Sequence, residues 1–288
     1  MSALALPNRR VEAWKYSDLR AALADAAPPP LALEDGAPII ARLAGGFEEV
    51  VVGGEQVRVE RFEGVGLEAR AVRFHVSPGA MLTRVVVQGG AGIPLSYAEV
   101  RLATGARFRQ FVLAEGGRLA RIETHVDVEG EGAEVELNGV YLAGPGRHAD
   151  LTSRITHHVA NGKTSQLIKG AARAKGRGVF QGKILVARGA QKTDARQGHH
   201  ALLLDEGAEV YAKPELEIYA DDVSCAHGNT AGALSAEQLF YLRARGIPAP
   251  QARALLVEAF LGEAVSDWLP EAERAEIQQR IHAWLEAG

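Results

Sequence analysis

The sequence predicts an all-β core shaped as a solenoid, with a helix before it and a helical segment after it. Short apolar runs recur from about residue 39 to residue 223, and most of them end in a turn that contains glycine. Glycine is plentiful, at 32 of 288 residues, whereas aromatic residues make up only 6% of the chain. The turn sequence Gly-Ala-Glu begins at Gly132 and again at Gly207, as expected for a fold built from repeated coils.

Residues 1–38 are expected to hold one helix and a proline-rich linker. Within residues 6–26, Asn8 fits the position that caps a helix N-terminus. The apolar residues that follow at helical spacing on one face are Val11, Trp14, Leu19 and Leu23. Three consecutive prolines at residues 28–30 cannot continue a helix, so the linker is predicted there.

Residues 39–233 are expected to form the β core. Apolar runs such as Ile-Leu-Val and Leu-Leu-Leu are continuous rather than alternating, and small residues occupy the turns between them. Both features favour a solenoid, whose coils stack apolar side chains inward and place small residues at the corners. A β-sandwich stays open as the alternative, because one sequence does not determine which strands pair.

Residues 234–288 are expected to be helical. Ser235 fits an N-cap with Gln238 three residues later, and Gly246 fits the left-handed position after a helix end. The later helices are expected to bury two apolar sets, Leu255, Leu256, Ala259 and Phe260 in one and Ile277, Ile281, Trp284 and Leu285 in the other. Phe240 and Tyr241 put aromatic rings on more than one face of the first helix, which is typical of a helix that binds a partner or one that caps the core.

The bulk composition excludes several classes of protein. A formal net charge of −4 and a pI of about 6.2 argue against nucleic acid or an anionic membrane as the main partner. A single cysteine excludes an internal disulfide and favours a reducing compartment. The sequence has no signal peptide and no apolar run long enough to span a membrane, so we expect a soluble, cytoplasmic protein.

The stretch Asp-Asp-Val-Ser-Cys-Ala-His-Gly, residues 221–228, holds the residues best suited to chemistry. On an extended segment, Cys225 and His227 point to the same face, where thiolate and imidazole suit iron, zinc or copper. Two ligands are too few for a closed metal site, so a partner or distant residues would have to complete it. The alternative is that Cys225 is a buried structural residue and that Asp221 and Asp222 form a surface turn.

Other polar motifs give weaker signals. The pairs His157–His158 and His199–His200 would place their members on opposite faces of a strand, so at most one of each pair can join a common site. Five basic residues between Lys169 and Lys183 are expected in a solvated, glycine-loosened turn. The sequence contains no P-loop, dinucleotide-binding, nucleophile-elbow or zinc-protease motif, and no catalytic set is evident.

Residues 139–269 nevertheless resemble a known family. The matching motifs, in order, are F-x-G-K-I at Phe180–Ile184, A-Q-K-T-D-A-x-Q at Ala190–Gln197, P-x-L-E-I-x-A-D-D-V-x-C-x-H-G at Pro214–Gly228 and E-Q-L-F-Y-L-x-x-R-G-I at Glu237–Ile247. Together they are similar to the core of the SufB/SufD family of iron–sulfur cluster assembly scaffolds. Gly228 after His227, and the N-terminal stretch LPNRRVEAWKYSDL, resemble the SufD-type branch. Asn229 departs from the usual alanine, and His199–His200 from the usual small polar residue and asparagine.

This resemblance implies a right-handed parallel β-helix and a non-enzymatic scaffold. It implies that a SufB-like subunit pairs with the end of the β-helix, where His227, with Cys225, contributes to cluster assembly. It also implies that a SufC-like ABC ATPase docks on the C-terminal helices, at Leu239, Phe240, Tyr241, Leu242, Leu255 and Phe260. No cofactor is expected to bind stably to this chain alone, while a transient iron–sulfur cluster is expected in the complex, with Cys225 and His227 as candidate metal ligands. A homodimer in isolation and flavin binding stay open.

A second function of a different class is a stand-alone cytoplasmic β-helix enzyme that acts on carbohydrate. Its candidate carboxylates are Asp194, Asp221 and Asp222. The sequence shows no evident pair of carboxylates for glycoside chemistry, which weighs against this function.

Overall fold

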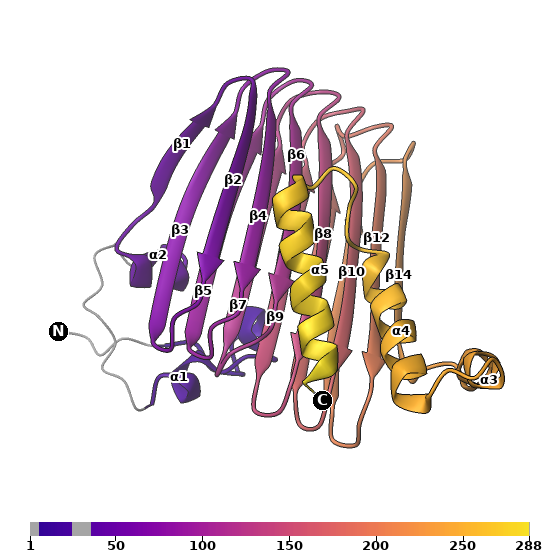
Figure 1. The fold of residues 1–288 in the computed structure, drawn as a ribbon. Helices are drawn as coiled ribbons and strands as arrows, with labels where there is room; N and C mark the ends of the chain where they lie inside the picture. The colour runs from indigo at the N-terminus through magenta and orange to yellow at the C-terminus, as the bar shows by residue number, and fades with distance from the viewer. Residues whose placement is uncertain (1–5, 25–35, 288) are drawn as a thin grey trace.

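In a computed structural model of the chain, which describes residues 6–24 and 36–287, the strands wind into a parallel β-solenoid (Figure 1). The odd-numbered strands form one seven-stranded sheet and the even-numbered strands form the other. All neighbouring strands are parallel. The predicted solenoid is therefore confirmed. The strands are β1 Glu48–Val52, β2 Glu55–Phe62, β3 Leu67–Val76, β4 Met81–Gln88, β5 Ile93–Leu102, β6 Arg107–Ala114, β7 Ala120–Val128, β8 Glu134–Ala143, β9 His148–His157, β10 Lys163–Ala172, β11 Arg177–Val186, β12 Asp194–Leu203, β13 Glu209–Ile218 and β14 Ser224–Gly232.

Many of the turns between strands share one backbone geometry. Gly132 and Gly207, the first residues of the two Gly-Ala-Glu turns, have φ of 69° and 75° and lie two residues before the next strand. Asn161 and Lys192, with φ of 63° and 60°, occupy the equivalent place before β10 and β12. Glycine adopts this left-handed conformation without a steric cost, which explains why these turns are rich in glycine.

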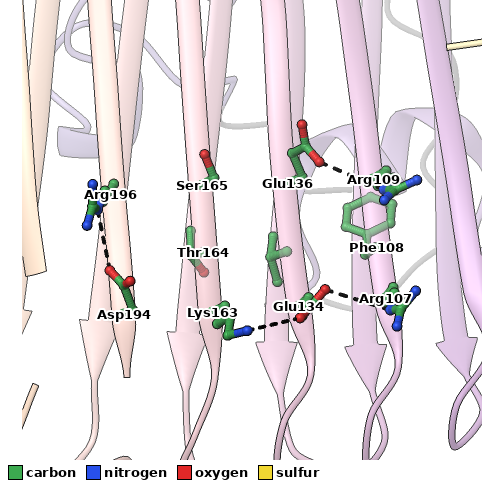
Figure 2. Close-up of a pocket in the computed structure, with 11 residues that line it drawn as sticks. Arg107, Phe108, Arg109, Glu134, Glu136, Lys163, Thr164, Ser165, Asp194 and Arg196 are labelled. Atoms are coloured by element: carbon green, nitrogen blue, oxygen red, sulfur yellow. Dashed lines mark hydrogen bonds and ion pairs between the residues drawn. The ribbon is translucent and has the colours of Figure 1, made fainter. Parts of the chain in front are cut away.

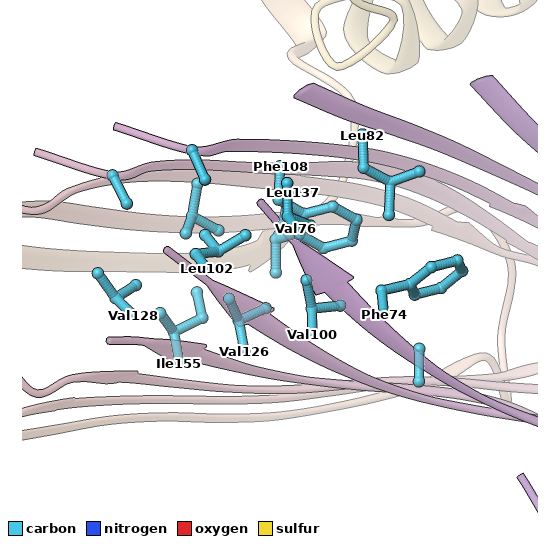
Figure 3. Close-up of a cluster of buried hydrophobic side chains, with 14 of the residues drawn as sticks. Phe74, Val76, Leu82, Val100, Leu102, Phe108, Val126, Val128, Leu137 and Ile155 are labelled. Atoms are coloured by element: carbon cyan, nitrogen blue, oxygen red, sulfur yellow. The ribbon is translucent and has the colours of Figure 1, made fainter. Parts of the chain in front are cut away.

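The interior between the two sheets is mostly apolar, and its largest cluster is drawn in Figure 3. The labelled side chains come from both sheets and are Phe74, Val76, Leu82, Val100, Leu102, Phe108, Val126, Val128, Leu137 and Ile155. Arg84 is a buried exception: its guanidinium bonds both carboxylate oxygens of Glu60, at 2.8 and 3.0 Å, and the side chains of Gln110 and Ser96, each at 2.8 Å. The buried charge is thus paired and hydrogen-bonded.

The N-terminal segment packs on the outer face of the odd-numbered sheet. The single helix expected over residues 6–26 is wrong, because the segment forms a 3₁₀ turn, η1 Glu12–Trp14, and a short helix, α1 Leu19–Ala22. Asp18 caps α1, and Asn8 instead accepts a hydrogen bond from the backbone of Arg10. Residues 39–44, which the sequence places in the β core, form the short helix α2 Ile39–Ala44 against the same face. The predicted linker lies mostly outside the described residues.

The C-terminal helices are α3 Ala236–Ala244, α4 Ala249–Gly262 and α5 Glu271–Glu286. The Ser235 cap and the left-handed Gly246, with φ of 86°, are confirmed. Figure 1 shows α4 and α5 lying across the outer face of the even-numbered sheet. None of the described helices is long and apolar enough to cross a membrane.

The predicted buried face is right for α5 but wrong for α4. Helix α5 buries Ile277, Ile281 and Leu285, with Trp284 half-buried beside them. The fully buried residues of α4 are Ala252, Val257 and Leu261, whereas Leu255 is 43% exposed. The mostly apolar sequence of α4 allows more than one buried stripe, and packing against the sheet selects one of them.

Candidate functional site

The solenoid ends at β13 and β14, and each of these strands pairs on one side only among the described strands. The register of β14 on β12 determines which of its side chains face the interior. The in-register pairs that share the inward face are Cys225 with Ala195, His227 with Gln197, and Asn229 with His199. The three β12 residues are buried, whereas Cys225 is half-buried and His227 and Asn229 are exposed. The inward row of β14 is therefore an open end that no further coil of the described chain covers.

Cys225 and His227 lie in one row, as their spacing predicts. Cys225 packs against the apolar interior, and this burial raises the pKa of its thiol. The protonated thiol, a weak ligand, is therefore favoured in the chain alone. Among the residues that the structure describes, no group of three or more His, Cys, Asp or Glu side chains is placed to hold a metal ion. The open end thus offers two soft ligands, which form an incomplete site.

A buried network of side chains holds Asn229, the third inward-facing residue of β14 after Cys225 and His227. His199 stacks between the rings of Phe180 and Tyr141, with centroids 4.9 and 5.8 Å away. Its ring nitrogens contact Tyr141 Oη at 3.0 Å and Asn229 Oδ1 at 2.7 Å. Burial lowers the pKa of His199 to about 4, so its neutral ring donates through Nδ1–H to Asn229 and accepts from the tyrosine hydroxyl. The Asn229 amide group is therefore held with its oxygen inward.

The sequence analysis did not predict this network. The alternation of the two histidine pairs, however, holds. His199 is buried while His200, on the outer face, bonds Thr230 at 2.7 Å. His157 is likewise buried and its neighbour His158 is exposed, 2.9 Å from Asp127. The alternation of side chains along a strand therefore correctly predicted that the two members of each pair lie on opposite faces. It did not predict which member faces the interior.

Helix α3 extends away from the solenoid (Figure 1), and none of its residues is buried. Phe240 is 73% exposed and Tyr241 is 54% exposed, while Leu239 and Leu242 are half-buried. Leu255, on α4, is also exposed. Phe260 differs from this set, because its half-buried ring lies 4.1 Å from the ammonium group of Lys169. Three of the six predicted docking residues are thus exposed, and Phe260 contacts its own chain.

A groove of about 720 Å³ lies between α4, α5 and the loop after β12. Its floor is apolar and includes Leu234, Val257 and Leu285, and its rim carries Arg253 and Glu286. Leu234 immediately precedes α3. The groove and the exposed helix therefore form one continuous region at the C-terminal side of the molecule.

A second hollow, of about 300 Å³, lies on the outer face of the even-numbered sheet (Figure 2). Its charges alternate in sign from strand to strand and pair with one another. The ion pairs are Arg107 with Glu134 at 3.7 Å, Lys163 with Glu134 at 3.4 Å, Arg109 with Glu136 at 3.8 Å and Arg196 with Asp194 at 3.5 Å. We call these ion-paired residues on β6, β8, β10 and β12 the charge ladder, and Asp194 is one of them. Asp221 and Asp222 are exposed before β14.

The basic stretch from Lys169 to Lys183 is not a loose turn, so that prediction is wrong. Its residues lie mainly on β10 and β11 and have specific partners: Lys169 with Glu263, Arg173 with the carbonyls of Trp284 and Leu285, Arg177 with Glu209, and Lys183 with Glu217. The two residues of this stretch that bind the C-terminal segment, Lys169 and Arg173, fasten it to the solenoid. Sequence spacing could not identify these partners, which lie far away in the chain.

A serine, a histidine and an aspartate also meet beneath the N-terminal segment. Ser17 Oγ lies 2.5 Å from Asp150 Oδ2 and 3.0 Å from His148 Nε2, and Arg121 Nη1 bonds the same Asp150 oxygen at 2.8 Å. Ser17 and Asp150 are fully buried, and the aspartate contacts the serine rather than the histidine. This arrangement is unlike a catalytic triad, and it anchors the N-terminal segment to the sheet.

Comparison with known proteins assigns the family. The model of the SUF system FeS cluster assembly SufBD core domain matches residues 49–260, which is most of the chain and nearly all of the solenoid. The chain belongs to the SufBD family. The predicted resemblance is confirmed, and the SufBD core corresponds to the β-solenoid together with α3 and most of α4.

Three relatives illustrate the similarity. The Escherichia coli iron–sulfur cluster assembly protein SufD is 36% identical over 173 residues, which cover 60% of this chain and 41% of that protein. An iron–sulfur cluster assembly SufBD family protein of Mycobacterium leprae is 32% identical over 281 residues, covering 91% of this chain and 71% of the relative. The chloroplastic protein ABCI7 of Arabidopsis thaliana is 34% identical, and the match covers 49% of that protein. The chain thus spans less than half the length of two of these relatives.

Proposed function

We propose that this SufBD protein is a non-enzymatic scaffold subunit of an iron–sulfur cluster assembly complex. A SufB-like subunit pairs with the open end of the solenoid, a SufC-like ABC ATPase docks on the C-terminal helices, and the iron–sulfur cluster is the cargo. His227, with Cys225, contributes to cluster assembly at the subunit interface. Membership of the SufBD family, and a relative named as an assembly protein SufD, support this function.

The open end of the solenoid is the observation that carries the proposal. The last strands present unpaired backbone groups, which favour pairing with another chain. The same end exposes two soft side chains, Cys225 and His227, in one row, and this incomplete set can be completed by ligands from the partner. Pairing would also bring the thiol and the imidazole into a drier environment, where their interactions with a cluster are stronger.

The role of His227 is tested by His227→Ala, with His200→Ala as the matched control. His200 lies on the neighbouring strand but faces outward and bonds Thr230. In cells that lack their own copy of the gene, His227→Ala is expected to lower the activity of an iron–sulfur reporter enzyme about tenfold, as loss of a metal-site residue does. The control is expected to retain activity. Normal maturation with His227→Ala would rule out this role.

The ATPase-docking surface is tested by the double replacement Phe240→Ala and Tyr241→Ala. Exposed aromatic residues contribute a large share of binding energy where they enter an interface, and both rings are exposed on α3. We expect co-purification of a SufC-like ATPase to be lost while the unfolding midpoint stays unchanged. Val65→Ala, at an 87% exposed residue between β2 and β3, is the control and should bind normally. Undiminished co-purification of the double variant would refute docking at α3.

No observation favours the carbohydrate enzyme. Asp194 pairs with Arg196 in the charge ladder, and Asp221 and Asp222 lie in an exposed turn rather than facing each other across a groove. Cleavage of a polysaccharide by the purified chain would reopen that function.

A further inference from the structure

A row of polar side chains inside the solenoid leads to His227. The register places Gln166, Gln197 and His227 at the same inward position on β10, β12 and β14. Gln166 is 5% exposed and Gln197 is 3% exposed, so both amides are fully inside the solenoid. Gln197 belongs to the A-Q-K-T-D-A-x-Q motif, to which no function was assigned above.

Gln166 exchanges hydrogen bonds with Ser153 and accepts another from Gln197. Gln166 Nε2 donates to Ser153 Oγ at 2.9 Å, and Gln197 Nε2 donates to Gln166 Oε1 at 2.9 Å. If the Gln197 amide were reversed, its oxygen would face the oxygen of Gln166, and two acceptors would meet. The orientation of Gln197 is therefore determined by the residue behind it.

This orientation leaves a buried acceptor beside His227. Gln197 Oε1 is buried and makes no hydrogen bond within the described part of the chain. A buried amide oxygen without a partner is destabilising, because it has lost water and gained no donor, so a donor is expected there. His227 is the next residue in the row, and neighbouring strands are only about 4.8 Å apart. An imidazole N–H is a donor of the kind that this oxygen lacks.

A second motif residue makes room for this row. Gly182, in the F-x-G-K-I motif, lies on the facing sheet, and a Cβ there would be 2.4 Å from Gln197 Nε2 and 2.5 Å from the Phe180 ring. No side chain larger than hydrogen fits at that position without displacing Gln197. Two separate motifs thus cooperate to hold one amide group under His227.

We propose that Gln197 is a positioning residue for His227. Its Oε1 accepts a hydrogen bond from one imidazole N–H, so the second ring nitrogen presents its lone pair at the open end. A neutral imidazole with one nitrogen held by an acceptor is the form in which histidine binds iron. The contribution to cluster assembly rests on the function proposed above, whereas the hydrogen bond itself does not.

The hydrogen bond is tested on the purified full chain by ¹⁵N spectra of labelled histidines above neutral pH, where the two tautomers have distinct nitrogen shifts. The His227 signals are identified by their loss in His227→Ala. We expect one tautomer in the unmodified chain and a mixture of two in Gln197→Met. Gln166→Met removes the acceptor that orients the Gln197 amide and should give a smaller admixture of the second tautomer. His200→Ala, on the outer face of the same strand as Gln197, is the matched control and should retain one tautomer. Mixed tautomers in the unmodified chain, or no change in Gln197→Met, would overturn the proposal.

The functional consequence is measured in the same cells as His227→Ala. Gln197→Met is expected to lower reporter maturation about tenfold, the usual cost of losing a group that orients a metal-site histidine, and Gln166→Met is expected to lower it less. Equal losses in the two glutamine variants would show that the row acts only as packing. If His227→Ala matures the reporter normally while Gln197→Met still mixes the tautomers, the proposed function fails and the hydrogen bond stands.

Discussion

Lowering the pH from 7 to 5 should destabilise this protein through three buried histidines. His148, His157 and His199 are each less than 10% exposed, and burial lowers the pKa of each to about 4, from an ordinary value of 6.5. In the unfolded chain these rings take up a proton as the pH falls below about 6.5. In the folded chain they stay neutral until about pH 4. The unfolded state therefore binds more protons between these values, and stability falls as the pH falls.

The size of the effect follows from the pKa difference. With a pKa of 6.5 unfolded and about 4 folded, one histidine lowers the free energy of unfolding by about 2 kcal/mol between pH 7 and pH 5. Three such residues together lower it by about 6 kcal/mol, a large share of the 5–15 kcal/mol typical of a folded domain. The buried carboxylate Glu123, with a pKa lowered to about 2, loses its stabilising charge only at lower pH. The window between pH 7 and pH 5 therefore isolates the histidines.

Urea unfolding at pH 7 and at pH 5, followed by circular dichroism, measures this difference directly. His157→Gln should reduce the difference by about 2 kcal/mol, because one of the three buried rings is removed. His282→Gln, a control on the exposed side of α5, should leave it unchanged. Stability that is equal at the two pH values, or a pH dependence unaffected by His157→Gln, would refute the assignment of neutral buried rings.

Other predictions concern packing and charge, and each is measured as a shift in the urea unfolding midpoint. Gly170→Ala should cost several kcal/mol, because the new Cβ would lie 1.9 Å from a buried tyrosine ring, whereas Gly228→Ala enters open space and should be near neutral; equal midpoints would contradict this. Arg121→Met should cost about 3–5 kcal/mol, because it leaves Asp150 buried without its cation; a smaller loss on adding Asp150→Asn would support that cause. Leu261→Ala should cost about 2–5 kcal/mol; a neutral effect would show that α4 is not fastened to the sheet.

The sequence predicted the features that depend on local chemistry. The Ser235 cap, the left-handed Gly246 and the turns at Gly132 and Gly207 all follow from residue types and short spacings. The N-terminal helix failed because a distant contact competes with local propensity: Ser17 leaves the helix and bonds Asp150, 133 residues away. A single sequence contains no signal for such a pair.

In the candidate site, too, the sequence predicted the local features and missed those that depend on distant contacts. The alternation of side chains along a strand was enough to place Cys225 and His227 on one face. The change from short apolar runs to a helical pattern placed them near the end of the β core. That this face is the interior, and that no coil of the described chain covers it, follows only from the register of β14 on β12. The orphaned oxygen of Gln197 was likewise beyond the sequence, because its orientation depends on Gln166 in another coil.

The two departures from the family pattern are easier to understand together than apart. His199 and Asn229 are in register on neighbouring strands, and their side chains bond each other at 2.7 Å. A buried histidine with one ring nitrogen unpaired would be costly, and Asn229 removes that cost. Asn229 itself is exposed at the open end, in the same inward row of β14 as His227. His199 and Asn229 together therefore keep the buried imidazole hydrogen-bonded at the face where a partner is expected to bind.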